Sequence, residues 1–105
     1  MKDYSAMSDF DIQQAVLHET WGKHPVRLLG KMMLDIMLSD YDPCNNPTDA
    51  WPIILSERIS IEHDGDCWRS DLFNENGGYE AESDSPLRAA MAVFLMMKDA
   101  EECHG

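Results

Sequence analysis

The sequence predicts an α+β fold, in which a small antiparallel sheet packs against a long C-terminal helix and an N-terminal helix. A broad apolar stripe at helical spacing runs through residues 86–102, and a helix-capping signal precedes apolar residues near the N-terminus. Residues 58–82 alternate apolar with polar between turn signals, which indicates about three strands. Because the strands are grouped and do not alternate with helices, we expect the helices on one face of the sheet.

Length and charge limit the class of protein. A chain of 105 residues is expected to form one domain, residues 1–105, with a single core. Its net charge of −12 argues against direct binding to nucleic-acid phosphates, and favours either a basic protein partner or simple solubility. We expect no membrane span, since no apolar run is long enough. Three scattered cysteines without a signal peptide predict a cytoplasmic protein without disulfides.

The first helix is predicted from the capping box of Ser8 and Asp11 to about His18. Its apolar face is expected to dock on the C-terminal helix or on a sheet, and comprises Phe10, Ile12, Val16 and Leu17. Glycine and proline in residues 21–25 then end the helix. Residues 26–38 fit two structures, a helix by their leucine and methionine spacing, or a hairpin that turns at Gly30.

Residues 39–47 are rich in turn formers and lead into a short helix. Asn46 can cap this helix, and Pro47 suits its first position. Pro52 is close enough to the start to be tolerated. Trp51, Ile53 and Ile54 are expected to anchor the helix to the core.

Two turns divide the region that follows into strands. Residues 58–62 alternate as a half-buried strand does, residues 63–66 form a turn, and residues 67–73 form the second strand. A second turn at residues 74–78 precedes a third strand at residues 79–82.

The C-terminal helix is predicted from Pro86 to about Glu101, with Ser85 as its cap. Its apolar residues recur at three- and four-residue steps and form a wide stripe, made of Leu87, Ala89, Ala90, Met91, Val93, Phe94, Met96 and Met97. So wide a stripe predicts deep burial, and we expect the rest of the domain to be organised around this helix.

Several motifs resemble the NinX-like family of bacteriophage proteins. They are Asp3-Tyr-Ser-Ala-Met-Ser-Asp-Phe-Asp-Ile12, Asp42-Pro-Cys-Asn-Asn-Pro-Thr-Asp-Ala-Trp-Pro-Ile-Ile54, the Ile-Ser-Ile strand with a tryptophan in the next strand, and Ser85-Pro-Leu-Arg-Ala-Ala-Met91 before a Phe-Leu-Met-Met helix. The resemblance covers most of the chain and is weakest over residues 21–38. It implies a small accessory protein of tailed phages or prophages in the host cytoplasm, and it carries over no catalytic residue.

The sequence predicts no enzyme, and we expect no catalytic, cofactor-binding or metal-ligating residue. His63, Asp64, Asp66 and Cys67 are close in sequence, but zinc sites draw ligands at defined spacings from two separate elements. A cysteine–histidine nucleophile pair involving Cys44 has no orienting motif. The glycines at residues 77–78 lack the lysine and the following helix of a phosphate-binding loop.

We therefore expect a protein–protein interaction module, with a nucleic-acid mimic that inhibits a host defence nuclease as the alternative. The candidate partner-binding residues lie in a loop and in the predicted hairpin and third strand: Tyr41, Asn45, Asn46, Trp51, Glu62, Asp64, Asp66, Glu80 and Glu82. The loop residues also fit a plain helix cap with Trp51 as core filler. The carboxylates also fit a charged edge that discourages aggregation. The partner of a mimic would be a basic nucleic-acid-binding host protein.

Overall fold

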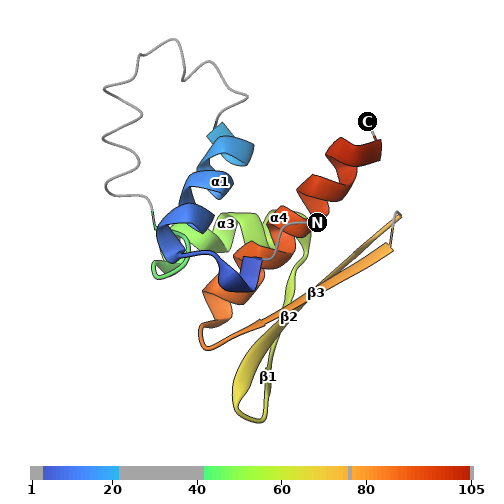
Figure 1. Cartoon of the computed structure of the whole chain (residues 1–105). Coiled ribbons are helices and arrows are strands. Elements are labelled where there is room, and N and C mark those ends of the chain that lie inside the picture. The colour runs from blue at the N-terminus through green and yellow to red at the C-terminus, as the bar shows by residue number, and fades with distance from the viewer. Residues whose placement is uncertain (1–3, 22–41, 76, 105) are drawn as a thin grey trace, which may run out of the picture.

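The computed structural model describes residues 4–21, 42–75 and 77–104 (Figure 1). Both the choice between helix and hairpin for residues 26–38 and the candidate Tyr41 lie outside these ranges. The described elements are the 3-10 turn η1 (Tyr4–Ala6), the helices α1 (Asp9–Trp21), α3 (Pro47–Glu57) and α4 (Pro86–His104), and the strands β1 (Ser60–Asp64), β2 (Cys67–Asn74) and β3 (Gly77–Ser83).

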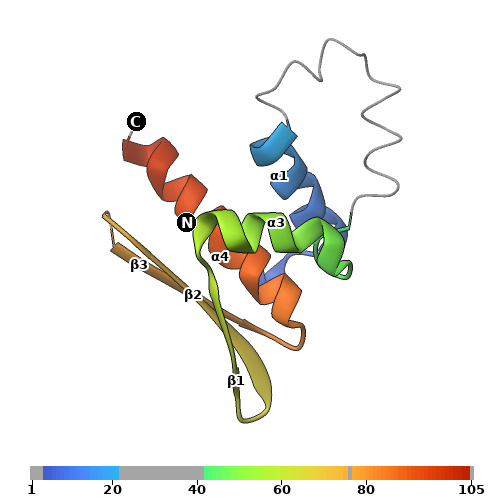
Figure 2. The same cartoon turned by 180° about the vertical axis from the view of Figure 1, so that it is seen from behind.

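The strands form one antiparallel sheet in the order β1-β2-β3, and the helices lie on one of its faces (Figures 1 and 2). This arrangement confirms the predicted α+β fold with N-terminal and C-terminal helices. A strand directs successive side chains to opposite faces. The sheet therefore has one face toward the helices and one face directed away from them.

Helix α4 lies between the sheet and the helices α1 and α3. It packs against β2 and β3 on one side and against α1 and α3 on the other. Seven consecutive residues, 89–95, are buried, which a helix in contact with a single neighbour does not achieve. Ser85 caps the helix as predicted, because its hydroxyl accepts the Arg88 N–H at 3.4 Å.

Helix α1 docks on α4, as expected. The hydroxyl of Ser8 accepts the N–H of Asp11 at 3.1 Å, and Ile12, Val16 and Leu17 are buried. The expectation for Phe10 was wrong, since 55% of its surface is exposed. Two helical steps of about 100° place Phe10 almost opposite Ile12, on the solvent side of the helix.

Helix α3 begins at the predicted cap, where the Asn46 side chain accepts the Thr48 N–H at 3.0 Å. Ile53 and Ile54 reach the core as predicted, together with Ala50. Trp51 does not fill the core, because 51% of its surface is exposed. It lies one helical step, about 100°, from Ala50 and therefore beside the buried face.

The strands differ from their predicted limits by one or two residues. Arg58 ends α3 in the left-handed conformation, with φ 58° and ψ 48°, so β1 begins at Ser60 and not at Arg58. The N–H groups of Arg58 and Ile59 both bond to the carbonyl of Ile54. His63 belongs to β1, and only Gly65 and Asp66 form the turn to β2.

We expect Phe94→Ala to lower the free energy of unfolding by about 3–5 kcal/mol, because Phe94 is buried on α4 and its removal leaves a cavity. Phe10→Ala is the matched control, with an expected loss below about 1 kcal/mol at a half-exposed helical position. Urea denaturation of both variants measures the difference. Equal losses would show that α4 does not hold the core together.

Candidate functional site: the acidic face of the sheet

Five carboxylates lie on the face of the sheet directed away from the helices. Strand alternation places the buried Ser70 and Leu72 toward the helices, and therefore places Arg69 and Asp71 on the opposite face. The strand register aligns their neighbours with them, in the rows Glu62–Arg69–Glu82 and Ser60–Asp71–Glu80, with Asp64 and Cys67 forming the next row. We call Glu62, Asp64, Asp71, Glu80 and Glu82, with Arg69 at their centre, the acidic face.

Arg69 is the one cation of the acidic face. Its guanidinium forms an ion pair with Glu62 and lies 3.8 Å from an Asp64 oxygen and 3.7 Å from an Asp71 oxygen. The carboxylates of Glu62 and Asp71 raise the pKa of Arg69. Five carboxylates against one guanidinium leave the acidic face strongly negative.

Four predicted site residues, Glu62, Asp64, Glu80 and Glu82, thus share one face. The fifth acidic candidate, Asp66, lies in the turn at the tip of the first hairpin. Asp71 and Arg69 were missed as site residues, although the alternation of β2 places both on the same side as Phe73. Asp71 and Arg69 join the other carboxylates through the pairing register of the three strands. The sequence of a single strand does not show this register.

An aromatic ring stands at one end of the acidic face. Phe73 follows Asp71 at a two-residue step, and 80% of its surface is exposed. Its ring lies over Gly78, where an added Cβ atom would be 2.6 Å from the ring. Phe73, Gly78, Asp71 and Glu80 line a shallow hollow of about 210 Å³ with Tyr79.

The loop candidates lie in the helical layer and are separate from the acidic face. Asn45 donates from its side-chain amide to Asp42 at 3.0 Å and to Asp9 at 3.4 Å. Asn46 caps α3. All three side chains are exposed, and the amides of Asn45 and Asn46 have structural partners.

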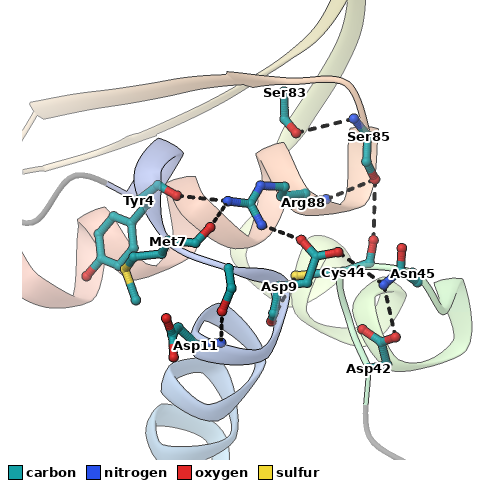
Figure 3. Close-up of polar contacts among 11 residues, drawn as sticks. Tyr4, Met7, Asp9, Asp11, Asp42, Cys44, Asn45, Ser83, Ser85 and Arg88 are labelled. Atoms are coloured by element: carbon teal, nitrogen blue, oxygen red, sulfur yellow. Dashed lines mark hydrogen bonds and ion pairs between the residues drawn. The ribbon is translucent and has the colours of Figure 1, made fainter.

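The residues around this loop form a polar cluster that joins η1, α1 and α4 (Figure 3). Arg88 of α4 donates to the carbonyls of Tyr4 and Met7 and pairs with the carboxylate of Asp9. The Ser85 hydroxyl donates to the carbonyl of Cys44 at 3.3 Å. Hydrogen bonds and an ion pair thus join segments that are far apart in sequence at the start of α4.

Both thiols of known position are held in the protonated form. Burial first, and then the charge of Asp9, raise the pKa of Cys44 to about 12. Desolvation and the nearby Glu82 raise the pKa of Cys67. Because the thiolate is the reactive species, neither environment activates a nucleophile.

The residues considered as metal ligands do not converge. His63 lies on the helix side of β1, with its ring 5.0 Å from that of Trp68, whereas Asp64 and Cys67 lie on the acidic face. Within residues 4–21, 42–75 and 77–104, no group of three or more histidine, cysteine, aspartate or glutamate side chains could hold a metal ion. In those same ranges, no helix combines the length and the apolar character needed to cross a bilayer.

A comparison with protein families finds a match over most of the chain. The model described as "Bacteriophage P22, NinX" matches residues 3–98. Searches of the curated proteins and of the solved structures find no match.

We expect Arg69→Gln to lower the melting temperature at low salt, because the five carboxylates then repel one another without a central cation. The difference from the parent should shrink as sodium chloride rises, since salt screens charges at the surface. Lys98→Gln is the control, because it removes a cation outside the acidic face. A loss of melting temperature that salt does not change would mean that Arg69 stabilises the fold through packing.

We expect the stability of the protein to fall as the pH rises from 9 toward 12, partly because of Cys44. Its pKa is about 12 in the folded chain and 9.0 for an ordinary thiol, so the unfolded chain loses this proton first. The stability that depends on the protonated Cys44 thiol is complete below pH 9 and is lost as the pH approaches 12. Urea denaturation between pH 7 and 10.5 should show a weaker pH dependence for Cys44→Ala, whereas parallel curves would contradict the assignment.

Proposed function

The chain belongs to the bacteriophage P22 NinX family, and from this premise we propose that it is a phage accessory protein that binds a basic protein through its acidic face. The proposal assigns the chain a binding role in the host cytoplasm and no catalytic step. The observation that carries it is the gathering of five carboxylates from three strands on one face of the sheet. A negative surface of this kind attracts and orients a positively charged partner.

The exposed ring of Phe73 supports binding more than simple solubility. Solubility requires charge, but it does not require an aromatic side chain that is four-fifths exposed beside the charges. Aromatic residues are enriched at the centres of protein interfaces, where they fill pockets of the partner. Phe73 is therefore the anchor that we assign to this surface, and the carboxylates around it select a basic partner.

A nucleic-acid mimic is the second candidate, and the spacing of the carboxylates favours it. Glu62 with Asp64, and Glu80 with Glu82, are pairs at two-residue steps of roughly 6.6–7 Å. Successive phosphates of one DNA strand lie a comparable distance apart. The partner would then be a basic nucleic-acid-binding host protein, such as a restriction or RNA-guided nuclease.

The test is capture of partners from host lysate at low and high salt. We expect the parent to capture a basic protein that salt releases, and Glu80→Gln/Glu82→Gln to lose it. Glu57→Gln/Glu101→Gln is the matched control, because it changes the net charge equally at sites on α3 and α4. Equal capture by the two double variants would contradict the acidic face as the binding surface.

Competition separates the two candidate functions. Duplex DNA should displace a partner that is held by mimicry, since both would occupy its nucleic-acid site. A partner that DNA does not displace, but that Phe73→Ala weakens, would support an interaction module and would exclude the mimic.

A further inference from the structure

Strand β3 forms an edge of the sheet. Within the described ranges it pairs with β2 alone, in the antiparallel register from Trp68↔Ser83 to Asn74↔Gly77. An edge strand has unpaired N–H and C=O groups along its outer side, and these can pair with another chain.

The turn of the first hairpin determines which residues of β3 carry these free groups. Asp64 and Cys67 flank a two-residue turn whose first residue, Gly65, has φ 69°, as a type II′ turn requires. The pair that closes such a turn is hydrogen-bonded, and hydrogen-bonded pairs then alternate along the ladder. Cys67, Arg69 and Asp71 therefore bond to β1, which leaves Trp68, Ser70 and Leu72 to bond to β3.

It follows that Ser83, Ala81 and Tyr79 bond to β2, whereas Glu82, Glu80 and Gly78 direct their backbone groups outward. The same three residues face away from the helices. Free backbone groups and two carboxylates of the acidic face thus coincide on Glu80 and Glu82.

Strand β3 is better suited to receive a partner than the other edge, β1. It has seven residues against five, and α4 supports its inner side more extensively. Arg69 forms its ion pairs with carboxylates of β1 and β2. Within the described ranges, Arg69 does not come within ion-pair distance of Glu80 or Glu82, which can therefore meet a partner's cation.

We propose that an extended segment with alternating basic and apolar residues adds to the edge of β3 as a fourth strand, a proposal that rests on the function proposed above. Its basic side chains would lie opposite Glu80 and Glu82, and its alternate side chains would turn toward the helix side with Tyr79 and Ala81. A second copy of the chain does not fit this position, because its own β3 would place glutamates against glutamates.

The test uses a synthetic peptide of alternating lysine and valine, matched to the seven residues of β3. The lysines should form the hydrogen-bonded pairs with Glu80 and Glu82, so N-methylation of the lysine amides should weaken binding about tenfold or more. N-methylation of the valine amides is the matched control and should change affinity less than about threefold, because those amides point away from β3. Amide exchange should slow at Glu80 and Glu82 and stay unchanged at His63 of β1.

The other outcomes separate this inference from the proposed function. The two methylated peptides could bind the parent protein with equal affinity and fail to bind the Glu80→Gln/Glu82→Gln variant. That result would overturn strand addition and leave side-chain binding at the acidic face intact. Failure of the parent peptide to bind at low salt would also overturn strand addition. The lysate capture described above decides the proposed function independently of either result.

Discussion

The burial of α4 on both of its sides is the constraint on which the rest of the structure depends. A helix buried through residues 89–95 must be covered by the sheet on one side and by α1 and α3 on the other. The three strands bury only one of their faces in this way, because the described helices all lie on the same side of the sheet (Figure 2). The acidic face is therefore a consequence of where α4 lies, and its composition is free of the demands of the core.

The side chains of that face differ in exposure, from 16% for Asp71 to 58% for Asp64. β2 contributes Arg69 between two acidic neighbours, Glu62 and Glu82, so the central cation offsets part of the repulsion between strands. The edge strand β3 retains carboxylates without such a cation at ion-pair distance among the described residues. Charge on an edge discourages pairing with like chains and favours pairing with basic ones, so protection from aggregation and selection of a partner have the same physical origin.

Most of the fold could be predicted from the sequence because its signals are local. The caps at Ser8, Asn46 and Ser85 all act as their sequence positions indicate. Phe10 and Trp51 were misplaced because apolar character alone does not give the angle of a side chain around a helix axis. The acidic face was recognised only in part, since Arg69 and Asp71 join it through the strand register, which depends on contacts between strands.

Three residues of the motifs that carry the family resemblance hold the helices in place. Asp9 and Arg88 join η1 and α1 to α4 (Figure 3). The Asn46 side chain caps α3. These contacts establish how the helices meet, so membership of the family informs the fold. The acidic face uses alternate residues of the strands, whose side chains are directed away from the helices. Substitutions on the acidic face are therefore expected to leave the contacts that hold the helices together in place.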